Sequence, residues 1–160
     1  VKILAYDVPE DREDGKAWKT TVVDESMHMT HNFDVFVNAP NASPVEAVSV
    51  AGKEGIRTSS LTRGKWLGVS EEVKNGLGEF RFHSLDLQVG ISPMHGNSVV
   101  VIPTNTAKMK AIDDTLNQGH ALAMGGLLGK EKGLPQIVAG WRSPDKDGKV
   151  GIKLYMARSA

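Results

Sequence analysis

The stretch of residues 97–128 constrains the fold more than any other part of the chain. It opens with Ser98-Val99-Val100-Val101-Ile102, and such a run of β-branched residues suits a strand covered on both faces. Pro103 ends this strand, and the polar run Thr104-Asn105-Thr106 can cap a helix that follows it. The apolar side of that helix, at spacings of three and four, would hold Met109, Ile112, Leu116, His120, Ala123 and Leu127. The stretch therefore predicts a buried central strand, a turn suited to a polar or anionic ligand, and a long helix.

Length and charge restrict the classes of function. At 160 residues the chain can bury a sizeable core, and we expect residues 1–160 to form a single domain. Lys plus Arg equal Asp plus Glu at 19 each, so no global field recruits nucleic acid or an anionic membrane. No apolar run approaches the length of a membrane span. We therefore expect neither nucleic acid nor a membrane as a partner.

The chain has no cysteine, which excludes disulfides, thiolate nucleophiles and metal sites built on cysteine. Met27, His28, Met29 and His31 lie close together, but a mixed strand edge explains them better than copper. The sequence therefore predicts no metal site. We expect a cytoplasmic protein, although the absence of cysteine is equally compatible with the periplasm.

Several further segments have the pattern of strands. Residues 1–6 and 18–23 predict a hairpin, and residues 32–38 alternate with the strand period. Residues 79–91 predict a strand with a register break near His83-Ser84. Residues 135–141 and 150–156 predict a second hairpin.

Two shorter segments predict helical structure. Ser43-Pro44 is a good helix start for residues 44–51, and Ser70 can cap a helical turn over residues 69–74. With the long helix, these segments predict an α+β fold: a two-layer mixed or antiparallel sheet with helices on one face.

Four motifs stand together in residues 32–141. They are Phe33-Asp34-Val35-Phe36-Val37 before Ser43-Pro44-Val45-Glu46, then Phe82-His83-Ser84-Leu85, Asn97-Ser98-Val99-Val100-Val101, and Gln118-Gly119-His120-Ala121. Together they resemble the formaldehyde-activating enzyme family. This family condenses formaldehyde with tetrahydromethanopterin and has a two-layer α+β fold like a ribosomal protein S5 domain 2. The resemblance implies a carbon–oxygen lyase of one-carbon metabolism.

The resemblance also assigns site residues. It implies that Asp34 binds the pterin and that Gln118 helps to hold it. The family's threonine falls among Thr104, Asn105 and Thr106, and a pocket leucine of the family falls at Asp86. The family's acid–base histidine falls at Asn32, and its lysine falls at or beside Pro103. The chain therefore lacks both of these chemical groups at the matching positions.

Two functions remain open from the sequence. In the first, the chain condenses formaldehyde or a related small carbonyl with a tetrahydromethanopterin-like pterin, which is a co-substrate and not a tightly bound cofactor. His31 would be catalytic, and the substrate-binding residues would be Asn32, Asp34, Asp86, Thr104, Thr106 and Gln118. His31 would reach the face of Asp34 only through a bulge at residues 30–32. The missing histidine and lysine favour the second function, a catalytically silent small-ligand or pterin-binding protein or an oligomeric scaffold with the same fold.

The second face of the predicted long helix bears on assembly. It would carry Ala111, Gln118, Leu122 and Gly125, whose small side chains permit close approach by a neighbour. This face predicts a homo-oligomer, and the family resemblance implies a pentamer.

Overall fold

The computed structural model describes residues 1–37, 46–71, 76–84, 87–103, 108–126, 135–143 and 147–156. Within these ranges the chain forms strands and no helix. The strands are β1 (Ile3–Asp7), β2 (Lys19–Asp24), β3 (Thr30–Val37), β4 (Glu46–Gly52), β5 (Gly55–Thr62), β6 (Lys65–Glu71), β7 (Phe80–Ser84), β8 (Leu87–Ser92), β9 (Ser98–Pro103), β10 (Lys110–Asp113), β11 (Gln118–Gly125), β12 (Gln136–Arg142) and β13 (Val150–Tyr155). The described part of the chain is all-β, so the predicted α+β fold with helices on one face is wrong.

In the described ranges, no helix has both the length and the apolar character needed to cross a membrane.

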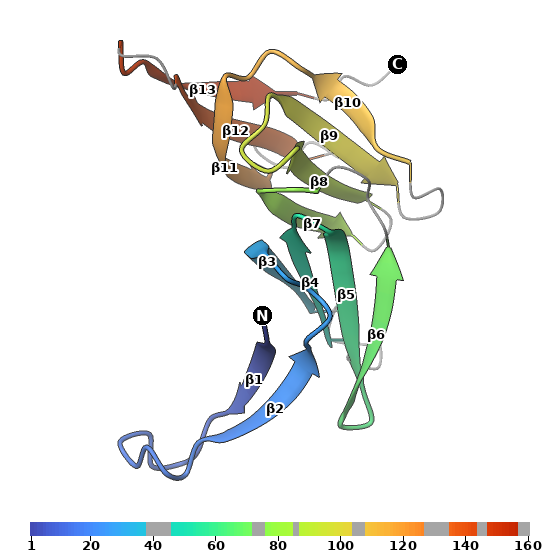
Figure 1. The fold of residues 1–160 in the computed structure, drawn as a ribbon, viewed down its shortest axis with the longest axis vertical. Helices are drawn as coiled ribbons and strands as arrows, with labels where there is room; N and C mark the ends of the chain where they lie inside the picture. The colour runs from blue at the N-terminus through green and yellow to red at the C-terminus, as the bar shows by residue number, and fades with distance from the viewer. Residues whose placement is uncertain are drawn as a thin grey trace.

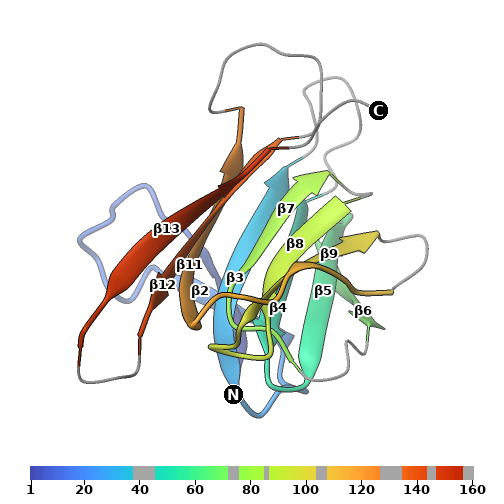
Figure 2. The ribbon, with the colours of Figure 1, turned by 90° about the horizontal axis from the view of Figure 1, so that it is seen from above.

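The strands form a hairpin and three larger antiparallel sheets (Figure 1). The N-terminal hairpin pairs β1 with β2, and the β3–β6 sheet has the order β3-β4-β5-β6. The β7–β10 sheet has the order β10-β9-β8-β7, and the β11–β13 sheet has the order β11-β12-β13. Figure 2 shows the β11–β13 sheet beside strands β7, β8 and β9. Both predicted hairpins, β1–β2 and β12–β13, are confirmed.

The β7–β10 sheet is packed on both faces, and β9 provides the central contacts. Val100 and Ile102 belong to one core cluster, and Val99 belongs to the other. The first cluster includes Ala51 and Ile56 from the β3–β6 sheet. The second includes residues of the β11–β13 sheet, namely Leu122, Ile137 and Ala139. The prediction of a strand covered on both faces at residues 98–102 is therefore confirmed, because its apolar side chains alternate between two cores.

The predicted long helix is wrong, because its described residues form β10 and β11. The side chains expected on one apolar stripe do not share a buried face, because Leu116 is buried whereas Ile112 and Ala123 are exposed. The ladder between β11 and β12 shifts register between Gly119 and Ala121, so β11 does not follow a simple strand alternation.

The two short helical predictions also fail. Residues 46–52 are β4, which is a central strand between β3 and β5 with Ser49 and Ala51 fully buried. The two ladders and the burial outweigh the weak strand preference of alanine and serine. Residues 65–71 are β6, and residues 72–75 lie outside the described residues.

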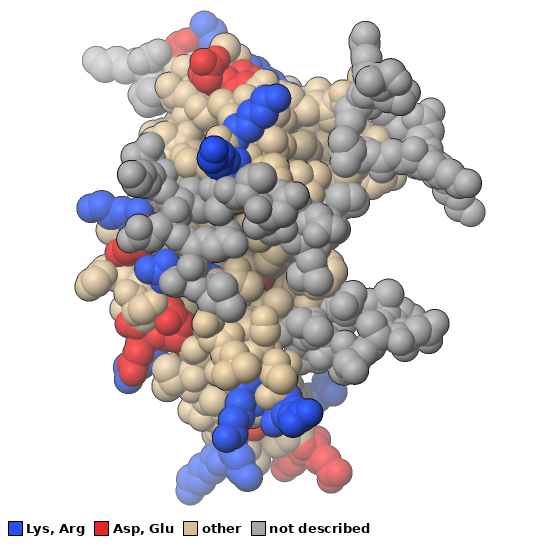
Figure 3. Space-filling view, turned by 90° about the vertical axis from the view of Figure 1, so that its right-hand side faces the viewer, with Lys and Arg blue, Asp and Glu red and all other residues tan. Residues whose placement is uncertain are grey.

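The β3–β6 and β7–β10 sheets meet edge to edge at β3 and β7. The Asp34 carboxylate fixes this junction, because its Oδ2 accepts a hydrogen bond from the Phe82 backbone N–H at 2.9 Å. The register break predicted near His83-Ser84 is confirmed as a shift between Phe82 and Ser84. On the face of the molecule in Figure 3, basic and acidic side chains are mixed.

Candidate functional site

Three histidines from three separate segments lie in ring contact where the sheets meet. The ring centroids of His31 and His95 are 4.4 Å apart at an interplanar angle of 85°. Those of His95 and His120 are also 4.4 Å apart, at an angle of 31°. We call His31, His95 and His120 the histidine row. It joins β3, the turn between β8 and β9, and β11.

Each histidine of the row lies at an irregular point of the backbone. The β3–β4 ladder shifts register between Thr30 and Asn32, which leaves His31 unpaired in the ladder. His120 is likewise unpaired in the β11–β12 ladder, which shifts register between Gly119 and Ala121. His95 has a φ of 56°, in the left-handed region that side chains other than glycine seldom adopt. Bulges re-aim side chains and are frequent beside active sites, so this coincidence indicates a functional arrangement.

Close backbone packing brings His95 to its neighbours. Gly78 permits this approach, because a Cβ there would lie 3.0 Å from the His95 backbone nitrogen. On the other side, the Gly119 N–H donates to the Gly96 carbonyl at 3.0 Å. The turn that carries His95 is thus held between the segment before β7 and the start of β11.

A buried carboxylate and an arginine adjoin the His31 end of the row. Glu79 is only 6% exposed, and its Oε2 accepts a hydrogen bond from Asn32 Nδ2 at 2.5 Å. Arg81 Nη1 donates to Asn32 Oδ1 at 3.0 Å, and Arg81 Nη2 lies 4.0 Å from Glu79 Oε2. His31 Nδ1 donates to the Gly78 carbonyl at 2.9 Å and lies 3.6 Å from Glu79 Oε1. Asn32 therefore holds Glu79 and Arg81 in fixed positions.

At the opposite end, Gln118 and Arg142 adjoin His120. Gln118 Oε1 accepts a hydrogen bond from Arg142 Nε at 2.9 Å and lies 3.3 Å from His120 Nε2. This contact favours the tautomer in which Nε2 carries the proton and Nδ1 is free to accept one. Burial, reinforced by the charges of Arg142, His95 and His31, lowers the pKa of His120. The imidazole of His120 is therefore a neutral proton acceptor at neutral pH.

The row adjoins a cavity of about 370 Å³. Its polar wall consists of Glu79, Arg81 and His120, and its floor is the outer face of the β11–β13 sheet. The residues of that floor have aliphatic side chains or, at Gly140, no side chain. They are Ala121, Ala123, Val138, Gly140 and Ile152. A volume of a few hundred Å³ with convergent polar groups at one side is typical of a small-ligand site.

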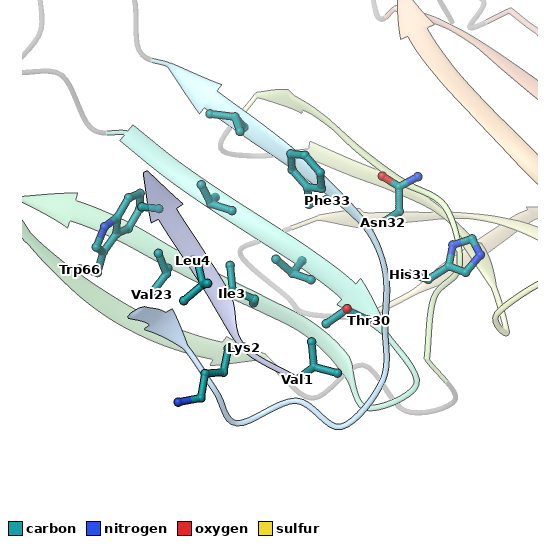
Figure 4. A pocket seen from close by; sticks show the side chains of 14 residues that line it. Val1, Lys2, Ile3, Leu4, Val23, Thr30, His31, Asn32, Phe33 and Trp66 are labelled. Atoms are coloured by element: carbon teal, nitrogen blue, oxygen red, sulfur yellow. The ribbon is translucent and has the colours of Figure 1, made fainter. Parts of the chain in front are cut away.

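A second cavity, of about 320 Å³, lies between the N-terminal hairpin and the β3–β6 sheet (Figure 4). Its lining is mainly apolar and includes Leu4, Val23, Phe33 and Trp66. Figure 4 shows His31 at the opposite end from Trp66, so the histidine row begins at one end of this cavity. The row thus extends from the margin of one cavity to the wall of the other.

The site does not have the form of a metal centre. Among the described residues, no group of three or more His, Asp or Glu side chains is placed to hold a metal ion. The histidine rings contact one another through their faces and edges.

The structure brings together three of the residues proposed from the sequence. His31 and Asn32 lie at one end of the row and Gln118 lies at the other, and the bulge needed to turn His31 is present. Asp34 is half-buried and ties β3 to β7. Asp86, Thr104 and Thr106 lie outside the described residues.

Sequence reasoning missed His95, Glu79, Arg81 and Arg142. A signal existed for two of them: Glu79 is a lone acid between Gly78 and the apolar run of β7, and His95 lies in a short turn between Pro93 and Gly96. The arginines carry no such signal, because only the pairing of distant strands places them at the row. Comparison of the chain with protein-family models, curated proteins and solved structures finds no match.

Proposed function

We propose that this protein binds a small molecule with an anionic group and a short aliphatic body in the cavity beside His120. The observation that carries the proposal is the histidine row, whose three members each lie at an irregular point of the backbone and whose last member, His120, lines the cavity. The left-handed φ of His95 is a costly backbone conformation, and such conformations cluster at functional sites. A ligand site explains why it is maintained.

The lining of the cavity supports this choice of ligand. Arg81 supplies a guanidinium, which forms strong charge-assisted hydrogen bonds to carboxylates and similar anions. Asn32 and Glu79 already hold Arg81 in place, so little side-chain freedom is lost when an anion binds. The aliphatic floor has no charged side chain to oppose the body of such a ligand.

The test is calorimetric titration with three probes: hexanoate, acetate and hexan-1-ol. Hexanoate has both the anionic group and the aliphatic body, so we expect it to bind more tightly than either of the others. The variant Arg81→Gln should weaken hexanoate binding by about tenfold to a hundredfold, the effect of losing one charged hydrogen bond. Arg12→Gln, at an exposed loop position, is the matched control and should bind as the wild type does. Absence of hexanoate binding, or equal weakening in both variants, would contradict the proposal.

A specific observation favours a second function, the assembly of copies into a scaffold. β13 lies at the edge of its sheet and exposes Val150 and Ile152 to 76% and 75%, and β3 exposes Phe33 to 64%. Edge strands with exposed apolar side chains are templates for pairing with another chain. Light scattering tests this function, which requires an oligomer at micromolar concentration.

A further inference from the structure

We infer that anion binding at the histidine row is coupled to proton uptake by the row, so that the protein holds its ligand more tightly as the pH falls. This inference rests on the proposed function and adds to it the way in which the site is regulated. It follows from the charges that converge on the row and from the spacing of its rings.

The groups that face the row come from every element packed against it. Two cations, Arg81 on β7 and Arg142 on β12, and one buried carboxylate, Glu79, lie beside the three imidazoles. The remaining described partners are neutral: Asn32, Gln118 and the Gly78 carbonyl. Glu79 thus supplies one negative charge beside the row. Arg81 and Arg142 supply two positive charges, and each imidazole that binds a proton would add another.

Two neighbouring members of the row that both carried a positive charge would repel each other. Neighbouring ring centroids are only 4.4 Å apart, and like charges at this distance repel one another strongly in a partly buried site. Burial and the surrounding positive charges already disfavour the charged form of His120. An anion beside Arg81 and His120 would offset this repulsion, so its arrival favours protonation of the row.

An unsatisfied atom lies in the centre of the row. The Nδ1 atom of His95 is buried and has no hydrogen-bond partner among the described residues. Such an atom carries a free-energy penalty that a hydrogen-bond partner brought by a ligand would relieve. His95 contacts both other rings, so a change at this position affects the whole row.

The number of protons taken up sets how strongly the affinity for the anion changes with pH. If one proton is taken up with each anion, the affinity should fall by about tenfold for each unit of pH increase across the range in which His120 is neutral in the free protein and charged in the complex. A carboxylic acid with an ordinary pKa stays ionised above about pH 6, so hexanoate does not change its own charge in this range. Any pH dependence of its binding therefore reports on the protein.

The experiment is titration of the full chain with hexanoate at about pH 6, 7 and 8, in two buffers of different ionisation enthalpy. We expect affinity to fall as the pH rises and the binding heat to differ between the buffers, which shows proton uptake. His120→Gln should reduce both effects, and His28→Gln should not, because the His28 side chain is exposed and lies outside the row. Circular dichroism verifies that each variant is folded.

The possible failures are distinguishable. Equal affinity at all three pH values with no buffer dependence would overturn the coupling but leave the proposed ligand site intact. If the affinity for hexanoate depends on pH in His31→Gln, His95→Gln and His120→Gln as it does in the wild type, the role of the row would be overturned. Absence of hexanoate binding at every pH would overturn the proposed function itself.

Discussion

At the scale of single residues, His120 links stability to pH. Its pKa is lowered in the folded chain by burial and then by Arg142, His95 and His31. The unfolded chain therefore binds the proton first as the pH falls, and the contribution of His120 to stability is present above its ordinary pKa of 6.5 and lost below it. His120 thus makes the ligand-free protein more stable at neutral than at mildly acidic pH.

This dependence can be measured by urea unfolding from about pH 7.5 to about pH 5.5. The free energy of unfolding of the wild type should fall across this range, and that of His120→Gln should fall less. His28→Gln retains the row and should follow the wild type. A decline in His120→Gln as steep as in the wild type would show that His120 does not titrate in the way described.

At the scale of elements, the site depends on how the turn carrying His95 packs against the segment before β7. A Cβ at Gly78 would meet the His95 backbone nitrogen at 3.0 Å and the Met94 Cα at 3.3 Å. Gly78→Ala should therefore displace the turn, lower stability by about 1 kcal/mol or more, and weaken hexanoate binding. Gly15→Ala meets no atom within 4 Å and is the matched control. Unchanged binding in Gly78→Ala would show that the position of the turn is unimportant.

The elements also show where sequence reasoning succeeds. The four β-branched residues of β9 identify a strand between two cores because each side chain faces one of them. Alternation likewise locates β3, β12 and β13, whose patterns depend only on neighbouring residues. The need for a bulge beside His31 was also predictable, because regular geometry would turn His31 away from Asp34.

Local sequence patterns could not predict the remaining elements or most of the site. The bulge between Gly119 and Ala121 interrupts the alternation of β11, so its strand period is hidden in the sequence. Glu79, His95 and Arg142 meet the row through contacts between segments far apart in sequence. The family resemblance implied a fold that the structure contradicts, and condensation of formaldehyde with a pterin stays a prediction.

At the scale of the whole molecule, the exposed apolar strands predict self-association. The edge strand β13 turns Val150, Ile152 and Leu154 outward. We expect multi-angle light scattering to give a mass above that of one chain at micromolar concentration, and Val150→Lys to lower that mass. Lys19→Gln, on the exposed part of β2, should have no effect. A wild type that is monomeric under these conditions would contradict the assembly prediction and leave the ligand site unaffected.

The ring signals of the histidines report on whether the cavity beside His120 binds its ligand. Hexanoate would be titrated into protein with ¹⁵N-labelled imidazoles, and the ring signals would be followed by nuclear magnetic resonance. We expect the signals of His95 and His120 to shift together along one saturable curve, while the signal of the exposed His28 keeps its position. Equal shifts at His28, or no shift at His95 and His120 at high hexanoate concentration, would contradict the proposed ligand site.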